Sequence, residues 1–400
     1  MNTNEKSGRI PELDGLRGVA ILLVLFYHYC RIGQPSPDGS AAGYFAALFR
    51  LGWSGVDLFF VLSGFLIGGI LMDARESPSY FRTFYLRRVH RILPAYYVWV
   101  TLFAVAMWVG PRLVAGAEVH SNVPLPFYYL FLQNLVFVAQ ATVAWFWLSP
   151  AWSLAVEEQF YLVAPPLVRW LSPQRLRGAL IATILLAPAL RVLLALRFPD
   201  APQMAYVLMP CRADALAFGV LAAMAWRSEA ARQWLTARAS RFRTVLLVMF
   251  AGLAVMLKFR WAFFPYSFFM ISIGYTLLAA AYCALLLYVL LATRSIAARV
   301  MRWRLLREWG KVSYCTYLIH LAVLGGCHYF ILGAEPRIHD LPGAGVTLLA
   351  AALTFALAQL SWRTFEKPLL QRGQRHTFAP PQATEAAHPV QPASPEPART

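Results

Sequence analysis

The chain has 400 residues, of which 59% are hydrophobic and only 14% are charged. About a quarter of the residues in soluble domains are charged, so this composition excludes an ordinary soluble protein and indicates one that spans a membrane. The formal net charge of +17 could indicate nucleic-acid binding, but the basic residues lie in short segments between apolar stretches, where they orient a membrane protein.

Ten apolar stretches are each long enough to cross the hydrocarbon core of a membrane, which takes about 20 helical residues. They cover residues 13–33, 52–72, 92–110, 148–170, 178–197, 206–226, 243–259, 266–293, 311–333 and 343–364. A further stretch, residues 125–146, contains Pro126, Gln133 and Asn134, and we predict that it forms a re-entrant or interfacial segment rather than another crossing. The sequence therefore predicts an all-α integral membrane protein with about ten transmembrane helices.

Basic residues are concentrated in every second connection between the apolar stretches. The basic connections include residues 87–91, 232–243 and 294–311, whereas residues 198–205 and 334–342 are almost free of Lys and Arg. Connections rich in Lys and Arg remain in the cytoplasm. Both termini are therefore expected to be cytoplasmic.

The chain is predicted to form one transmembrane domain over residues 9–370. Residues 371–400 are expected to form a disordered cytoplasmic tail, because from residue 378 onward they are rich in Pro, Ala, Gln and Glu and cannot bury a core. The first apolar stretch lacks a convincing small-residue cleavage site after it and is expected to stay as an anchor. The five cysteines include no Cys-x-x-Cys pair and are expected to be free thiols.

Two ionisable residues lie in the first apolar stretch, where each costs at least roughly 2.5 kcal/mol to insert. Arg17 and His28 are eleven positions apart, which is almost three helical turns, so they share one face with an axial separation of about 16 Å. A neutral imidazole can take a proton from an alcohol at neutral pH, which makes a buried histidine a candidate general base for attack on a thioester. The alternative is a core histidine that only packs.

An arginine pair precedes the third apolar stretch. Arg88 and Arg91 are three positions apart, so in a helix they lie on one face. The guanidinium group binds phosphate through two parallel hydrogen bonds, and the pair could hold the phosphates of a cytosolic cofactor. Orientation of the chain in the membrane is the alternative explanation.

Two adjacent carboxylates lie in the fourth apolar stretch. Because an apolar helix does not tolerate Glu157 and Glu158 as packing residues, at least one of them should face a polar cavity. Glu157 and Tyr161 are four apart and share a helix face, so Glu157 could orient His28 or hold an acceptor hydroxyl while Tyr161 lines the site. A structural ion pair between Glu157 and Arg212 is the alternative.

Three other polar residues lie in apolar stretches. Arg212 and Asp214 form an opposite-charge pair, and their mutual neutralisation is sufficient to explain both. His320 lies midway along the ninth stretch, where packing or substrate lining explains it better than a second general base. No His or Cys cluster has metal-ligand spacing, so a mechanism without a metal ion is the simpler expectation.

Together these motifs resemble those of the acyltransferase-3 family of bacterial membrane O-acyltransferases, over roughly residues 9–370. Arg17 and His28 are similar to the family's Arg-x10-His signature, and Arg88 and Arg91 to its Arg-x-x-Arg motif. The resemblance continues in the same order through residues 59–67, 152–161, 212–215 and 313–320.

The resemblance implies a ten-helix enzyme of the bacterial cell inner membrane that transfers an acyl group, usually acetyl, from cytosolic acyl-CoA to a hydroxyl of a glycan or glycolipid. It implies His28 as the catalytic residue, assisted by Glu157 or Glu158. The acetyl-CoA donor would be bound by Arg17, Arg88 and Arg91. The acceptor would contact Trp152, Tyr161, Arg212, Asp214 and His320.

The expected partners are the acceptor and membrane lipids, with no nucleic acid, and a partner protein could complete transfer outside the membrane. The acceptor could be a lipopolysaccharide sugar, an exopolysaccharide, a lipo-oligosaccharide or a small glycoside. A competing interpretation is a polytopic transporter or flippase for a glycan intermediate, because intramembrane charges also mark substrate pathways. A transporter would consume no thioester, and an inactive scaffold would tolerate the loss of His28.

Overall fold

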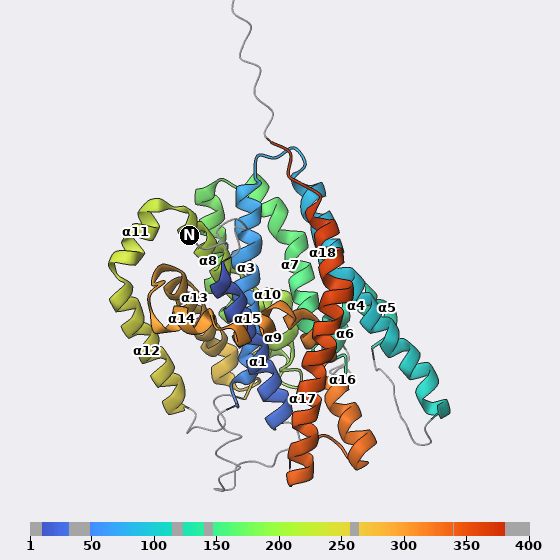
Figure 1. Ribbon diagram of the computed structural model, residues 1–400. Helices are drawn as coiled ribbons and strands as arrows, with labels where there is room; N and C mark the ends of the chain where they lie inside the picture. The colour runs from blue at the N-terminus through green and yellow to red at the C-terminus, as the bar shows by residue number, and fades with distance from the viewer. Residues whose placement is uncertain are drawn as a thin grey trace, which may run out of the picture.

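The computed structural model describes residues 10–31, 49–113, 123–139, 147–256, 264–338 and 340–380. Within these ranges every regular element is helical, and the long helices pack side by side into one bundle (Figure 1). This confirms the all-α architecture that the sequence predicts.

A long helix coincides with each of the ten predicted stretches. These helices are α1 (Pro11–Arg31), α3 (Gly55–Asp73), α4 (Tyr80–Leu113), α7 (Ala151–Trp170), α8 (Pro173–Arg197), α10 (Met209–Arg227), α12 (Ala239–Met256), α13 (Tyr275–Leu291), α16 (Ser313–Leu332) and α17 (Leu341–Ser361). Eight helical segments of the described chain are long and apolar enough to cross a membrane, and the other two predicted crossings coincide with α7 and α12. The protein is a multi-pass membrane protein.

Shorter helices lie between or continue the long ones. They are η2 (Gly52–Ser54), α5 (Leu125–Tyr129), α6 (Gln133–Ala139), α9 (Met204–Val207), α11 (Glu229–Ala237), η3 (Met270–Gly274), α14 (Ile296–Met301), α15 (Arg304–Lys311), η4 (Trp362–Glu366) and α18 (Lys367–Gln374). The helix α4 begins well before the predicted apolar stretch 92–110, so Arg88 and Arg91 lie inside a helix rather than in a connection. No Gly or Pro interrupts residues 80–93, which explains the longer helix.

The stretch 125–146, predicted to be re-entrant or interfacial, contains α5 and α6 in its described part, and neither helix is long enough to cross a membrane. The side chains of Gln133 and Asn134 are fully buried. Gln133 Nε2 donates a hydrogen bond to the carbonyl of Ala151 at 2.7 Å, and Asn134 Nδ2 donates one to the carbonyl of Val207 at 3.1 Å. The polar groups of this segment are therefore turned toward protein rather than lipid. Residues 140–146 lie outside the described ranges.

The centre of the bundle depends on a close crossing between α3 and α10. A Cβ atom added at Gly64 would lie 2.1 Å from the carbonyl oxygen of Leu216, and one added at Gly219 would lie 2.1 Å from that of Val61. Only glycine permits the two backbones to approach this closely, as in other membrane helix pairs. The crossing places Asp57 of α3 beside Arg212 of α10.

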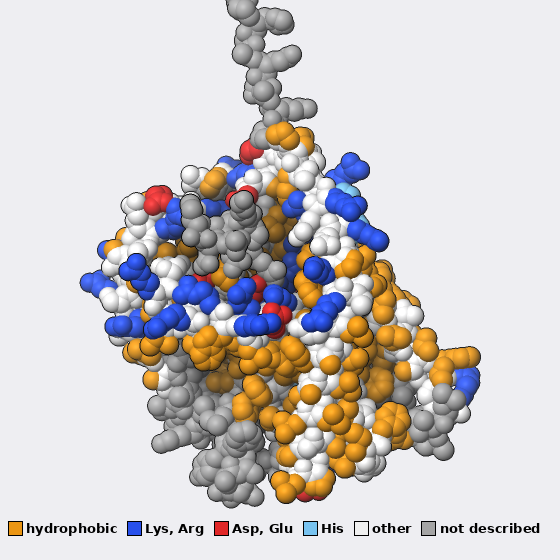
Figure 2. Space-filling view, viewed as in Figure 1, with side chains coloured by type: hydrophobic (Ala, Val, Ile, Leu, Met, Phe, Trp, Pro, Cys, Tyr) orange, Lys and Arg blue, Asp and Glu red, His pale blue; other side chains and the backbone are white. Residues whose placement is uncertain are grey.

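Charge is distributed unequally along the bundle. Figure 2 shows Lys and Arg side chains gathered over the upper part of the molecule, while the surface below them is largely apolar. The exposed leucines of α8 and α17, such as Leu185, Leu193 and Leu348, fit a surface that faces lipid. We refer to the upper half of the bundle, from the level of α14 and α15 upward and including α11 and the start of α4, as the basic end (Figure 1).

The first ten residues of the predicted tail, 371–380, lie in contact with α4. Arg87 Nε donates a hydrogen bond to the carbonyl of His376 at 2.7 Å, and the Thr83 hydroxyl donates one to the carbonyl of Thr377 at 3.2 Å. The guanidinium of Arg87 also lies 4.9 Å from the centroid of the Phe378 ring. These contacts hold the segment against α4. The polar composition of the segment does not predict them. Residues 381–400 lie outside the described ranges.

Candidate functional site

Two histidines from distant parts of the chain meet inside the bundle. His28 lies near the end of α1, and its Nδ1 is 2.9 Å from the carbonyl oxygen of Val24. His320 lies in α16, and its Nδ1 is 2.8 Å from the carbonyl oxygen of Tyr317. The Nε2 of His320 lies 3.2 Å from the Nδ1 of His28. The structure therefore brings the predicted catalytic residue into contact with a residue predicted only to line the acceptor site.

The hydrogen bonds assign the protons of this histidine pair. The carbonyl of Tyr317 can only accept, so the Nδ1 of His320 carries a proton and its Nε2 has a lone pair. The Nδ1 of His28 then donates to this Nε2 and to the carbonyl of Val24. Neutral His28 therefore keeps the lone pair on its Nε2. That tautomer is the one a general base requires.

A cavity of about 210 Å³ lies beside His28. Its wall is largely aromatic and is formed by residues of α1, η2, α3, α6, α7, α9 and α16 and of the segments 149–150 and 264–266. The ring-bearing side chains of the wall include His28, Trp53, Trp152, Tyr206, Tyr266 and Tyr317. Of the residues predicted to contact the acceptor, Trp152 is therefore placed at this cavity.

The carboxylate of Glu157 is held by hydroxyl groups. Its Oε1 accepts a hydrogen bond from the Ser63 hydroxyl at 2.7 Å, and its Oε2 accepts one from the Tyr161 hydroxyl at 3.3 Å. Neither Glu157 nor Glu158 is hydrogen-bonded to His28 among the described residues, and Glu157 forms no ion pair with Arg212 there. The side chain that contacts His28 Nδ1 is His320; the other role predicted for Glu157, holding an acceptor hydroxyl, stays a prediction.

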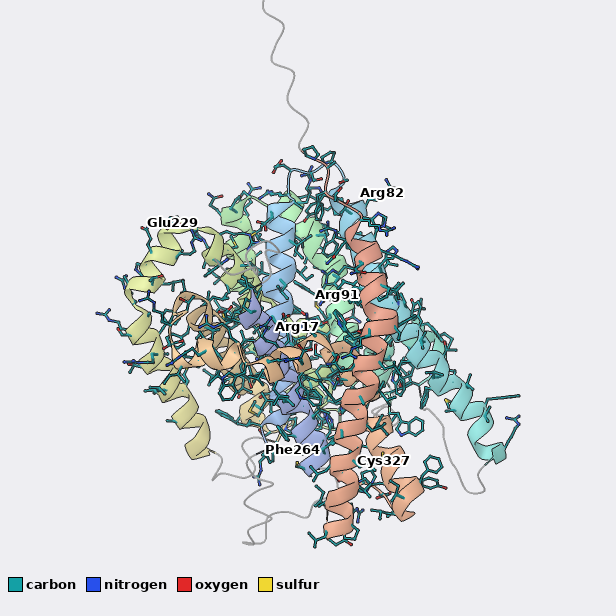
Figure 3. All side chains as sticks on the ribbon, in the orientation of Figure 1. Arg17, Arg82, Arg91, Glu229, Phe264 and Cys327 are labelled. Carbon is teal, nitrogen blue, oxygen red and sulfur yellow. The ribbon has the colours of Figure 1, made fainter. Side chains whose placement is uncertain are left out.

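Three predicted donor-binding arginines, Arg17, Arg88 and Arg91, form what we call the arginine cluster. The charge of Arg17 interacts with those of Arg91 and Glu157, and the Arg88 guanidinium lies 5.7 Å from the centroid of the Tyr161 ring. Figure 3 shows Arg17 and Arg91 at a similar height in the bundle. Within the part of the chain that the structure describes, no member of the cluster forms an ion pair, and the buried Nε of Arg88 has no hydrogen-bond partner.

The expected pairing of Arg212 with Asp214 is wrong. Arg212 pairs with Asp57 of α3, and Asp214 pairs with Arg191 of α8 at 3.0 Å. Residues two apart in a helix point in different directions, so each side chain meets a neighbouring helix instead. Both pairs are almost completely buried, and they connect α10 to α3 and α8.

Sequence reasoning missed three residues that take part in these networks. Asp57 is an acid within the apolar stretch 52–72, a position that by itself requires a partner, and Arg191 is a base within the stretch 178–197. Ser63 gave no such signal, because a lone serine is common in membrane helices. Its contact with Glu157 becomes visible only when α3 and α7 are placed together.

A family model described as an acyltransferase domain matches residues 10–363. The match covers most of the chain together with the histidine pair and the arginine cluster. The protein belongs to the acyltransferase-3 family.

Several curated proteins are similar to this chain. YrhL of Bacillus subtilis is 28% identical over 92% of this chain and 56% of its own length. The peptidoglycan O-acetyltransferase OatA of Listeria monocytogenes is 27% identical over 91% of this chain and 56% of its own. The O-acetyltransferase OatA of Staphylococcus aureus is 24% identical over 95% of this chain and 60% of its own. The chain thus spans little more than half the length of these relatives. No solved structure matches it.

Proposed function

We propose that the protein is a membrane O-acetyltransferase that moves an acetyl group from cytosolic acetyl-CoA to a hydroxyl of a glycan. The observation that carries the proposal is the histidine pair, in which His28 lies at the wall of a cavity and keeps the lone pair of its Nε2 available. Relatives named as O-acetyltransferases support the reaction type. The basic end of the bundle would face the cytoplasm together with both termini, in the cell inner membrane.

In the proposed reaction the acceptor hydroxyl gives its proton to His28 Nε2 as its oxygen attacks the thioester carbonyl. The carbon–sulfur bond of acetyl-CoA then breaks, and the departing thiolate takes the proton from His28, so that an acetyl ester and free CoA are formed. His320 accepts a hydrogen bond from His28 Nδ1, which holds the ring in the tautomer that the proton transfer needs. No described carboxylate contacts either ring nitrogen of His28.

The arginine cluster would hold the phosphates of the donor. Guanidinium groups bind phosphate oxygens strongly. Among the described residues no carboxylate forms an ion pair with the cluster, although the charges of Glu157 and Glu158 interact with it. Arg17 and His28 lie on one helix with an axial separation of about 16 Å, a distance that an extended pantetheine arm bridges. The carboxylate of Glu157, held by Ser63 and Tyr161, lies near this path and would order polar groups along it.

The deciding experiment compares His28→Ala with wild type in membranes that contain equal amounts of protein. Radiolabelled acetyl-CoA is the donor, the host glycan fraction is the acceptor, and ester-linked label is released by mild base. General-base catalysis contributes about 10²–10⁴-fold, so we expect a loss of that size. His328→Ala is the matched control, since His328 is also a buried histidine but bonds Thr347 within the α16–α17 pair.

Normal transfer by His28→Ala would refute the catalytic role of His28. Glycan export without thioester cleavage by wild type would favour the transporter interpretation. Free CoA and labelled glycan are measured in the same sample, so thioester cleavage and glycan export can be told apart.

The role of His320 is tested by comparing His320→Leu with His320→Gln. The leucine variant leaves the Nδ1 proton of His28 without its side-chain acceptor, and an unsatisfied buried donor costs about 1–3 kcal/mol. We expect kcat to fall about 5- to 100-fold with an unchanged donor KM. Because the Gln Oε1 can accept the same proton, His320→Gln should recover most of the rate, which a purely packing role would not predict.

A further inference from the structure

A short connection on the surface of the bundle exposes large apolar side chains. It consists of α14, α15 and the two residues between them, and Figure 1 shows both helices at the lower edge of the basic end. Ile296, Trp303 and Leu305 of this connection are 71%, 61% and 65% exposed, and no described part of the chain covers them. Exposed apolar side chains that are grouped in this way mark a surface that contacts another molecule.

Two basic side chains of the same connection are also open to the surroundings. Arg299 and Arg304 are exposed, and neither forms an ion pair within the described ranges. Arg302, in contrast, pairs with Glu12 of α1 at 2.9 Å. The guanidinium groups of Arg299 and Arg304 are therefore available to an anion outside the protein. We use the name α14–α15 band for the side chains of Ile296, Arg299, Trp303, Arg304 and Leu305.

The α14–α15 band lies where the apolar surface of the bundle ends. Figure 2 shows a row of Lys and Arg side chains along the lower edge of the basic end, with apolar surface directly beneath it. Lipid chains cover such an apolar surface as far as the headgroups, so the band lies at headgroup level. Trp is enriched at this level, and Lys and Arg there attract anionic lipids. The band therefore matches an anionic headgroup with its attached chains better than a soluble anion, which would leave the apolar side chains uncovered.

The band is packed closely against the first helix. The Ser295 hydroxyl caps α14 by accepting a hydrogen bond from the backbone N–H of Ala298 at 3.1 Å. A Cβ atom added at Gly18 would lie 2.0 Å from the carbonyl oxygen of Leu306, so the backbones of α1 and α15 are in direct contact. Gly18 directly follows Arg17 of the arginine cluster. A displacement of α15 is therefore transmitted to the part of α1 that carries Arg17.

We propose that the α14–α15 band binds the headgroups of anionic phospholipids in the leaflet at the basic end, and that this contact holds the start of α1 in place. The lipid phosphate accepts hydrogen bonds from Arg299 and Arg304, while the three apolar side chains of the band contact the upper part of the lipid chains. The lipid is then a ligand of the folded protein and not only the medium that orients it. The effect on donor binding rests on the proposed function, whereas the lipid contact does not.

The lipid contact is tested on the purified full chain in a neutral detergent. Dioleoylphosphatidylglycerol or dioleoylphosphatidylcholine is added, and bound lipid is counted by native mass spectrometry. Arg299→Gln/Arg304→Gln removes both charges of the band, and Arg175→Gln/Arg177→Gln removes two exposed charges at the start of α8 as the matched control. Each basic residue near an anionic surface strengthens binding about fivefold. We therefore expect the band variant to bind phosphatidylglycerol about 10- to 30-fold more weakly than wild type, and the control to bind it like wild type.

The apolar part of the band is tested by a variant that keeps every charge. Trp303→Ser should weaken phosphatidylglycerol binding at least about threefold, because apolar area no longer contacts the lipid. Equal weakening in both double variants would overturn the proposal, since it would show general charge attraction. Displacement of the lipid by inorganic phosphate, or equal binding of phosphatidylcholine, would overturn the anionic lipid as the ligand. Binding of neither lipid would also overturn the proposal and leave the band to a protein partner.

The link to α1 is tested by acetyl transfer in phosphatidylcholine nanodiscs made with or without phosphatidylglycerol. Acetyl-CoA is an anion, so surface charge alone would repel it and raise the donor KM when phosphatidylglycerol is present. If the headgroups hold α15 against α1, the donor KM instead falls at least about twofold, and Arg299→Gln/Arg304→Gln loses this dependence. A rise in the donor KM of wild type would overturn the link. If wild type transfers no acetyl group in either nanodisc, the proposed function fails, while the lipid binding measured by mass spectrometry is unaffected.

Discussion

Two groups of arginines within the same bundle differ in what surrounds them. Arg212 and Arg191 are completely buried, and each meets an aspartate of another helix, Asp57 and Asp214 respectively. The arginine cluster, in contrast, has no ion-pair partner within the described ranges, although the Nε of Arg88 is buried. Because a charge inside a membrane requires a counterion, a cavity or a ligand, the paired arginines are explained by the fold alone. For the arginines of the cluster, we propose that an anionic ligand takes the place of the counterion.

The buried pairs also explain why the two groups should respond differently to mutation. Arg191 donates hydrogen bonds to the carbonyls of Ile271 and Cys211 and to the Thr276 hydroxyl, in addition to Asp214. It therefore connects α8, α10 and the start of α13 at one point. A change in such a network affects the packing of several helices, whereas under the proposed function a change in the arginine cluster would affect the affinity for the donor.

The largest effect is expected from Arg212→Ala. The change leaves Asp57 buried without its counterion, and removing one partner of a buried pair costs about 3–5 kcal/mol. That is a large part of the free energy of unfolding of a typical domain. We expect little protein in the membrane and a low melting temperature in detergent, measured by size-exclusion chromatography of a fluorescent fusion after heating. Arg175→Ala, at an exposed position of α8, is the control, and a variant as stable as this control would contradict the structural role.

A smaller and different effect is expected from Arg88→Gln. Hydrogen bonds to charged groups contribute about 1.5–3 kcal/mol, so the loss of one phosphate contact should raise the donor KM about 10- to 100-fold. Protein level and melting temperature should stay close to wild type, because among the described residues Arg88 forms no ion pair that the change would break. Arg82→Gln is the control, since Arg82 is exposed on the same helix. If Arg88→Gln destabilised the protein and left the donor KM unchanged, the contrast between the two groups would be lost.

The sequence predicted the fold well because hydrophobic length is read directly from composition. Each of the ten predicted stretches coincides with a long helix, and the polar residues Gln133 and Asn134 marked a segment that does not cross as one helix. The start of α4 was missed because Arg82, Arg87 and Arg88 interrupt the apolar residues of its first turns, so that no continuous apolar stretch marks them. Arg88 and Arg91 were therefore placed in a connection although they lie within the helix.

The site could be predicted only where its residues lie on one helix. The spacing of Arg17 and His28 placed them on one face of α1 without any knowledge of the neighbours. The contact between His28 and His320 joins residues that are 292 positions apart, and the partner of Arg212 depends on how α3 and α10 cross. Helix spacing gives the direction of a side chain but not the helix it meets, which is why Arg212 was paired with Asp214 by mistake.

The smallest effect is expected at a partly exposed ion pair outside the membrane-spanning helices. The ammonium of Lys311 donates a hydrogen bond to Glu308 at 2.7 Å, and this bond lowers the pKa of the Glu308 carboxyl. A lowered carboxyl pKa stabilises the fold above the ordinary pKa of glutamate, and the contribution disappears as the pH falls through the lowered value. Glu308→Gln should therefore cost only about 0.2–1 kcal/mol at neutral pH, with the difference from wild type vanishing in acid. Melting temperatures of wild type and Glu308→Gln across this pH range would measure the difference in stability. A loss as large as that expected for Arg212→Ala would contradict the prediction that exposed ion pairs contribute less to stability than buried ones.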